Sequence, residues 1–156
     1  KNFSLIIKNK LGKDISHIKG SGAAGGLGGG FYAFLDGKLL PGIDVIFEKL
    51  GIEEILSDTV YIVTGEGKID SQSVMGKVLS GIGKLGKKYN IPVIGICGTL
   101  EDGIEELHKI GFTSLFSVIN KPMSLEMAMD KNVTKKLIEE NIIEIFRLLS
   151  GTIKCQ

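Results

Sequence analysis

Residues 60–70 read VYIVTGEGKID, an apolar run rich in β-branched residues that leads into two glycines and several charged side chains. β-branched and aromatic residues favour strands, and an unbroken apolar run is typical of a strand buried on both faces. The pattern predicts a strand over residues 60–64, a loop over 65–70 and a helix over about 73–89. A strand that passes through a short loop into a helix is the repeating unit of parallel α/β sheets.

The same unit recurs along the rest of the chain. Apolar runs at residues 92–97 and 114–119 predict two further strands, with helices expected over 102–110 and 124–149. Alternation of strands with helices predicts parallel strands, right-handed connections and helices on both faces of the sheet. The predicted fold class is therefore α/β, a Rossmann-like three-layer domain whose small sheet is partial.

The front of the chain has a different character. Apolar residues at 3, 6, 7 and 11 predict a helix that ends at Gly12, and a second helix is expected from Pro41 to Leu50. The predicted organisation is a helical, glycine-rich segment over 1–57 that belongs to a second domain, an α/β segment over 58–150 and a tail over 151–156. Because the chain starts with Lys1 and no cap precedes the first helix, we expect a fragment of a longer protein.

Composition excludes several classes of function. The 156 residues carry a net charge of +1, which gives no support to nucleic-acid or membrane-surface binding. No apolar run approaches the roughly 18 residues of a membrane span. Cys97 and Cys155 lack metal-ligand spacing and indicate a reducing, cytoplasmic compartment.

Residues 64–73, TGEGKIDSQS, and the following Gly76-Lys77 form the strongest candidate site. Ligands of open parallel sheets bind where strands end, and a glycine-rich turn can direct backbone N–H groups at an anion. Lysines there can neutralise phosphate, while carboxylates can hold Mg²⁺ or accept a hydroxyl proton. The alternative is an ordinary turn with a solvated charge cluster. The candidate residues are Gly65, Glu66, Gly67, Lys68, Asp70, Gln72 and Lys77.

A second candidate lies at residues 20–25, GSGAAG, with Ser21, Gly22 and Gly25 as possible ligand-binding positions. The segment formally fits the GxGxxG dinucleotide pattern, but the residues before it make a poor strand and no acidic residue occupies the ribose position. A loop that approaches another ligand or forms a domain hinge, and plain helix packing, are the other readings. The end of the second strand, Gly98-Thr99, is a lesser candidate.

Three stretches together resemble the bacterial two-domain glycerate kinase family. Residues 20–28, GSGAAGGLG, are similar to the family's GAGAAGGLG; residues 40–43, LPGI, are similar to its L-x-PGI; and residues 62–77 resemble its ITGEGxxDxQT…GK. Order and spacing also agree, over about residues 1–149. The departures are Ser21 in place of alanine and the lack of the family's N-terminal portion.

The resemblance implies that the chain is the C-terminal part of a kinase that transfers the γ-phosphoryl group of ATP, with Mg²⁺, to D-glycerate. It implies an active site in a cleft between two domains, which the fragment alone would leave incomplete and inactive; a homodimer stays open. Lys68 and Lys77 would meet phosphate or carboxylate, and Asp70 or Glu66 would be the base or the metal ligand. The rival readings are a non-kinase nucleotide- or anion-binding Rossmann-like domain and a domain whose glycines only pack helices.

Overall fold

The computed structural model describes residues 2–70, 73 and 77–153, apart from the side chains of residues 77, 152 and 153. The chain divides into two compact units, Lys1–Leu50 and Gly51–Gln156. The sequence analysis places this division after Ser57, whereas the structure assigns residues 51–57 to the second unit.

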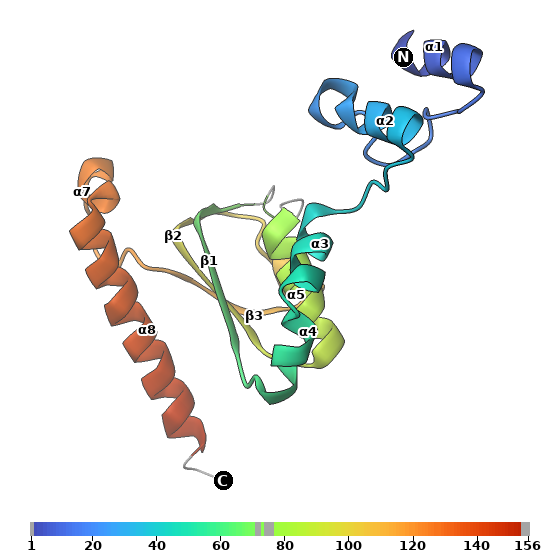
Figure 1. Cartoon of the computed structure of the whole chain (residues 1–156). Helices are drawn as coiled ribbons and strands as arrows, with labels where there is room; N and C mark the ends of the chain where they lie inside the picture. Colours follow the sequence, from blue (N-terminus) through green and yellow to red (C-terminus); the bar gives the residue numbers. More distant parts are fainter. Residues whose placement is uncertain (1, 71–72, 74–76, 154–156) are drawn as a thin grey trace. The chain divides into compact units, whose positions relative to one another are not determined.

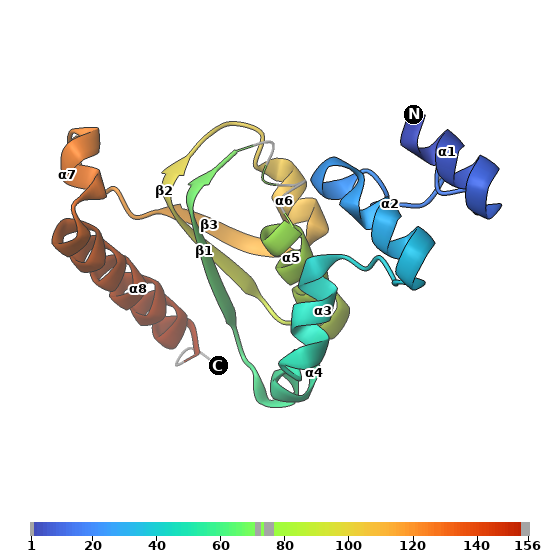
Figure 2. The ribbon, with the colours of Figure 1, turned by 45° about the horizontal axis from the view of Figure 1, so that its top comes forward.

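The first unit is helical. Its small core is formed by apolar side chains of the first two helices and the segment between them, namely Ile7, Ile15 and Ala33. Figure 2 shows the first two helices lying next to each other. The predicted end of the first helix is confirmed, because Gly12 has a φ of +68° and its N–H donates to the carbonyl of Lys8 at 3.0 Å. The helices are α1 (Asn2–Leu11), α2 (Ala23–Leu35) and α3 (Gly42–Lys49).

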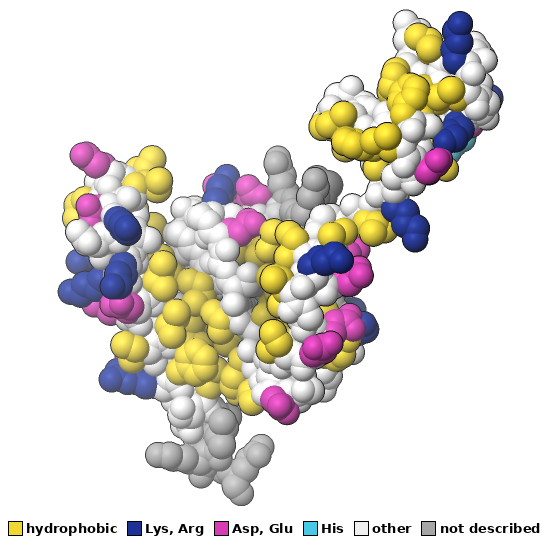
Figure 3. Space-filling model, viewed as in Figure 1, with side chains coloured by type: hydrophobic (Ala, Val, Ile, Leu, Met, Phe, Trp, Pro, Cys, Tyr) yellow, Lys and Arg dark blue, Asp and Glu magenta, His cyan; other side chains and the backbone are white. Residues whose placement is uncertain are grey.

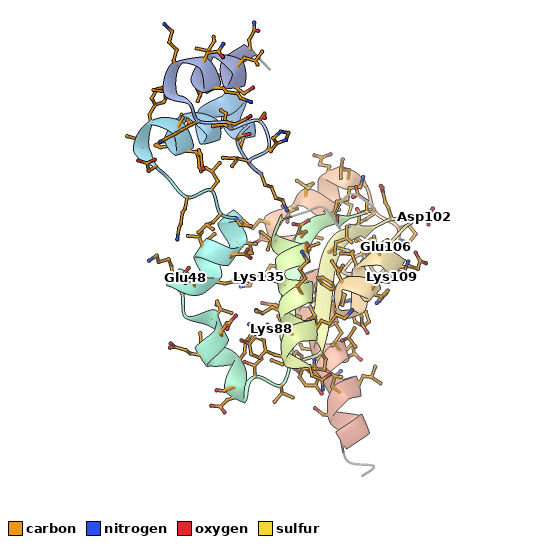
Figure 4. The ribbon with its side chains drawn as sticks, turned by 90° about the vertical axis from the view of Figure 1, so that its right-hand side faces the viewer. Glu48, Lys88, Asp102, Glu106, Lys109 and Lys135 are labelled. Carbon is orange, nitrogen blue, oxygen red and sulfur yellow. The ribbon has the colours of Figure 1, made fainter. Side chains whose placement is uncertain are left out.

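The second unit begins with α4 (Ile52–Ile55) and the 3-10 helix η1 (Leu56–Asp58). The Glu53 carboxylate accepts hydrogen bonds from Lys88 Nζ at 2.8 Å and the Tyr89 hydroxyl at 2.5 Å. Both donors lie at the end of α5 (Lys77–Tyr89), where Figure 4 labels Lys88. These contacts explain why α4 and η1 belong with the sheet unit rather than with the helices before them.

The sheet of the second unit has the strand order β1-β2-β3, and both pairings are parallel, as predicted (Figure 1). In the β1–β2 pair Ile62 lies opposite Val93 and Ile69 opposite Leu100, so these two strands end together. The β2–β3 pair is interrupted by an irregularity between Val93 and Ile94. The strands are β1 (Ile62–Ile69), β2 (Val93–Leu100) and β3 (Phe112–Ser117).

Helices cover both faces of this sheet, as the sequence predicts (Figure 1). On one face, α5 and α6 (Glu105–Ile110) pack on a core of almost fully buried residues: Ile69, Leu79, Val93, Cys97, Leu107 and Phe112. On the other face, α8 (Lys131–Ile153) covers a second core: Ile94, Ile96, Val118, Leu137 and Ile145. Burial of these side chains is the main stabilising contribution to the unit.

Two helix boundaries differ from the prediction. The expected single helix over 124–149 is divided into α7 (Leu125–Met129) and α8, because Asp130 leaves the helical conformation. Its carboxylate accepts from the backbone N–H groups of Asn132 and Val133, each at 3.0 Å, and so caps α8. Helix α3 begins at Gly42, with Pro41 at the N-cap position.

Figure 3 shows apolar side chains gathered on the second unit beside α8. Val60, Val63 and Phe146 are among its exposed apolar residues, and the rings of Tyr61 and Phe146 meet edge to face at 6.2 Å. Exposed apolar surface of this kind is typical of a face that binds another segment or molecule. Among the described residues no helix is both long and apolar enough to cross a membrane.

Candidate active site

Strand β1 continues through residues 65–69 of the motif TGEGKIDSQS. The predicted loop over residues 65–70 is therefore wrong for all but its last residue. A Cβ atom on Gly65 would lie 2.8 Å from the carbonyl oxygen of Ile96, and one on Gly98 would lie 2.7 Å from the carbonyl oxygen of Gly67. The glycines at 65 and 98 therefore allow two strand backbones to approach, and β2 supplies the pairing partners that keep β1 extended to Ile69. A Cβ on Gly67 would meet nothing within 4 Å, so that position is open.

The motif's charged side chains are spread along β1. Glu66 lies opposite Cys97 and Lys68 opposite Thr99, and both charged residues are exposed. Asp70 follows the last strand residue and is half-buried. Each strand residue advances the chain by about 3.3 Å, so Glu66 and Asp70 lie about 13 Å apart along β1. The two carboxylates thus stand at separate positions along the chain, and each can be considered singly as a Mg²⁺ ligand or base.

Asp70 is held on both sides of its carboxylate. Its Oδ1 accepts hydrogen bonds from the backbone N–H of Ser73 at 3.1 Å and from the Ser73 hydroxyl at 3.3 Å. In return, the backbone N–H of Asp70 donates to the Ser73 hydroxyl at 3.0 Å, and Ser73 is buried. The other oxygen, Oδ2, lies 3.3 Å from Lys68 Nζ. This reciprocal pattern resembles a helix capping box and fixes the direction of the carboxylate.

Lys68 is shared between two strand ends. Its ammonium lies 3.0 Å from Glu101 Oε2 and 3.3 Å from Asp70 Oδ2. Hydrogen bonds to Glu101, and next to Asp70, raise the pKa of Lys68 above its ordinary value, so the side chain stays positively charged at neutral pH. The backbone N–H of Glu101 donates to the carbonyl of Ile69 at 2.9 Å, which continues the β1–β2 pairing past the last strand residues.

Glu101 is a site residue that the sequence reasoning missed. It follows β2 much as Asp70 follows β1, and the carboxyl ends of neighbouring parallel strands meet at one edge of a sheet. The signal in the sequence is that both residues directly follow a predicted apolar strand. Figure 4 shows Asp102, the next residue, near Glu106 and Lys109 of α6, which form an ion pair.

Two predicted residues cannot be assessed in the same way. Gln72 lies outside the described residues, and Lys77 begins α5 but its side chain is outside the described set. Among the residues that the structure describes, no group of three potential metal-ligating side chains comes together. A single carboxylate such as Asp70 still fits Mg²⁺ binding of the kind seen in kinases, where one or two carboxylates act together with substrate phosphates.

The glycine-rich segment of the first unit has a packed part. A Cβ on Gly28 would lie 2.4 Å from the carbonyl oxygen of Gly20, and one on Gly29 would lie 2.7 Å from the Ile15 side chain. The backbone N–H of Gly29 donates to the carbonyl of Ser21 at 2.9 Å. Close packing therefore explains Gly28 and Gly29. Plain helix packing is one of the alternatives that the sequence offers for this glycine-rich region.

The same segment has an open part. A Cβ on Gly22 or Gly25 would meet nothing within 4 Å, although Gly25 has a φ of +67° that favours glycine. Ala24, Gly25 and Gly26 form a left-handed turn at the start of α2. Residues 14–18 before the segment form no strand, so the structural context of a dinucleotide-binding βαβ unit is lacking.

Comparisons with known proteins agree with this architecture. The model of the glycerate kinase family matches residues 1–150. The chain is 43% identical to the glycerate kinase of Halalkalibacterium halodurans over 83% of this chain and 34% of the relative, and 41% identical to the glycerate 2-kinase of Escherichia coli K12 over 81% and 33%. A crystal structure described as glycerate kinase 2 from Salmonella typhimurium LT2 superposes with a TM-score of 0.69 and 36% identity, covering 97% of this chain and 38% of that one.

The matched region is a part of these relatives. The chain spans about a third of the length of the two curated glycerate kinases, as their coverage of 34% and 33% shows. Within that third, the match extends over both structural units, since the family model covers residues 1–150. The chain therefore belongs to the glycerate kinase family.

Proposed function

We propose that the protein carrying this chain transfers the γ-phosphoryl group of ATP to a hydroxyl of D-glycerate and forms a phosphoglycerate. The observation that supports it is the arrangement of Lys68 and Asp70 at the end of β1, in a chain of the glycerate kinase family. Phosphoryl transfer requires positioning and charge neutralisation more than covalent chemistry by the protein. The Lys68 ammonium can neutralise negative charge, and the oriented Asp70 carboxylate can position the other reactant. We also propose a cytoplasmic location, because two cysteines without metal-ligand or paired spacing are typical of a reducing compartment.

In this proposal Lys68 binds an oxygen of the phosphate chain or of the glycerate carboxylate. The Lys68 side chain is 52% exposed, so an anionic ligand can reach it from solvent. The open backbone at Gly67, one residue before it, lets a ligand approach β1 without meeting a side chain. Glu66 is exposed two residues before Lys68, and its carboxylate would accept a glycerate hydroxyl proton or hold Mg²⁺ rather than contact phosphate directly.

Asp70 can act as a base or as a metal ligand. As a base it would accept the proton of the attacking glycerate hydroxyl; as a metal ligand it would hold Mg²⁺ together with phosphate oxygens. Bound Mg²⁺ would supply charge neutralisation of the transferred phosphoryl group. In either role the two hydrogen bonds from Ser73 keep the carboxylate in one orientation, which preorganises the site.

The first unit contributes the second candidate segment to this proposal. Gly22 and Gly25 have no atoms within 4 Å of a built Cβ, which supports close approach of a ligand to their backbone. Ser21 shares this segment, but its carbonyl is already used by Gly29. Lys77 and Gln72 remain proposed phosphate-binding residues on the strength of the sequence motif alone.

The test is ADP formation by the complete gene product with MgATP and D-glycerate. We expect turnover that depends on D-glycerate, that is lost when EDTA removes Mg²⁺, and that yields a phosphoglycerate whose position of phosphorylation is read by ³¹P NMR. Lactate, which lacks one hydroxyl of glycerate, is the matched control. Absence of glycerate-dependent ADP would refute the kinase proposal and favour a nucleotide- or anion-binding domain without this activity.

A further inference from the structure

Glu101 is fixed at the site through its backbone. Its N–H donates to the carbonyl of Ile69 at 2.9 Å, so the residue after β2 is held against the last residue of β1. Its side chain then extends to Lys68, with 3.0 Å between Oε2 and Nζ. Glu101 thus places a second carboxylate, from the end of the neighbouring strand, within ion-pair distance of the Lys68 ammonium.

The two carboxylates restrict the direction of the Lys68 ammonium. A lysine ammonium has three N–H donors and no acceptor. Asp70 and Glu101 each lie within ion-pair distance of Nζ and come from different strand ends, so they attract the ammonium from two positions. The two ion pairs limit the free rotation of a long side chain that is still half-exposed to an anionic ligand.

Stability alone does not account for this arrangement. The Lys68 and Glu101 side chains are 52% and 50% exposed, and ion pairs between exposed groups contribute little to folding. The hydrogen bond to Glu101 is also the largest cause of the raised pKa of Lys68, with Asp70 second. The contact thus acts mainly on the direction of one ammonium, at the edge where ligands of parallel sheets bind.

We propose that Glu101 is a positioning residue that acts through Lys68, holding its ammonium toward a bound polyphosphate at the ends of β1 and β2. This inference rests on the proposed function, because it takes Lys68 as the phosphate-binding group. Glu101 itself is not a ligand contact, since a carboxylate repels phosphate. Its removal is therefore expected to weaken anion binding even though a negative charge is lost.

The test is a double-mutant cycle on the complete gene product, with calorimetric binding of inorganic tripolyphosphate in the presence of Mg²⁺ as the readout. The four proteins are wild type, Glu101→Gln, Lys68→Met and the double variant. We expect Glu101→Gln to weaken binding about 2- to 5-fold, the range of an exposed ion pair, and Lys68→Met to weaken it about 10-fold or more. The double variant should bind no more weakly than Lys68→Met, because Glu101 has then lost the group through which it acts.

Two further variants separate positioning from a general charge effect. Glu106→Gln makes the same change in net charge on α6, where Glu106 pairs with Lys109 instead, and it should leave tripolyphosphate binding unchanged or slightly tighter. Glu101→Asp keeps the carboxylate and should recover part of the lost affinity. Additive effects in the double variant, tighter binding by Glu101→Gln, or no tripolyphosphate binding by wild type would each overturn the proposal.

Turnover is measured on the same proteins and keeps the two hypotheses apart. Wild type that turns over glycerate while the cycle is additive would refute the role of Glu101 and leave the kinase proposal intact. Coupled effects on tripolyphosphate binding without any glycerate-dependent turnover would refute the kinase proposal and leave the role of Glu101 in anion binding. If both the kinase proposal and the role of Glu101 hold, Glu101→Gln should raise the KM for MgATP more than it lowers kcat, as expected for a residue that acts on binding.

Discussion

Replacing Gly98 by alanine tests whether the glycines of the motif serve the sheet or the ligand. The new Cβ would lie 2.7 Å from the carbonyl oxygen of Gly67, and this neighbour is backbone that cannot rotate away. The strands must separate beside Lys68, a form of overpacking that costs about 1–3 kcal/mol. Alanine recovers about 0.5–1 kcal/mol of backbone entropy relative to glycine. The net loss in the free energy of unfolding is therefore about 1 kcal/mol, between extremes of about 0 and 2.5 kcal/mol.

Gly67→Ala is the matched control for Gly98→Ala. It adds the same methyl group on the neighbouring strand, where nothing lies within 4 Å. We expect no loss of stability, and a gain of up to about 0.5–1 kcal/mol from reduced backbone entropy of the unfolded chain. Its effect should instead fall on tripolyphosphate binding, because the added methyl group occupies the open backbone that we propose for ligand approach.

Calorimetric unfolding of the complete gene product measures both changes. In a protein of its relatives' length, well over twice this chain, a loss of about 1 kcal/mol corresponds to a fall in Tm of about 1–2 °C for Gly98→Ala, and Gly67→Ala should not lower Tm. Hydrogen exchange over 62–69 and 93–100 locates the effect, since only Gly98→Ala should weaken protection of the paired amides. Equal destabilisation by the two variants, or an unchanged Tm for Gly98→Ala, would refute the assignment of the close approach to Gly98.

Three other predictions concern stability, each read by thermal unfolding. Ala24→Gly should stabilise the first unit by about 0.5–1 kcal/mol, because Ala24 has a φ of 50° that strains an L-residue; a lower Tm would contradict this. Leu107→Ala should cost about 2–5 kcal/mol, because Leu107 is the fully buried residue through which α6 joins the core; a loss below about 1 kcal/mol would count against this role. Hydrogen bonds from Lys88 and then Tyr89 lower the pKa of Glu53 below its ordinary 4.5, so the contact stabilises the fold at neutral pH and weakens as the pH falls below 4.5. Glu53→Gln should therefore lower Tm more at pH 7 than at pH 3, and an equal effect at both pH values would disprove the link.

The sequence predicts the sheet well because its signals are local. Apolar β-branched runs mark β1, β2 and β3, and the helical segments between them require parallel strands. The extent of β1 could not be predicted, since glycine and charged residues are depleted in strands and Gly65–Lys68 reads as a loop. Pairing with β2 overrides that propensity, and pairing is not visible in one segment alone.

The candidate site was predicted in part. Lys68 and Asp70 were expected at one strand end, and the structure brings their charged atoms to 3.3 Å. Glu101 was missed because its place depends on β1 and β2 ending together, a matter of register that apolar patterns leave undetermined. Glu66 and Asp70 were alternatives for the base or the metal ligand; the structure places Glu66 within β1 and Asp70 directly after it, and the choice between them stays a prediction.

The most direct test of the site is Asp70→Asn in the complete gene product, assayed for glycerate-dependent ADP formation beside wild type. Asparagine can still accept the Ser73 N–H and caps nearly as well as aspartate, so folding should be retained. Asp58→Asn, at the exposed end of η1, makes the same change away from the strand ends and should keep full activity. The account predicts that Asp70→Asn lowers kcat by about 10²- to 10⁴-fold, the range for loss of a positioned base or charge. Turnover of Asp70→Asn within a few-fold of wild type would contradict the assignment of the chemistry to the ends of β1 and β2.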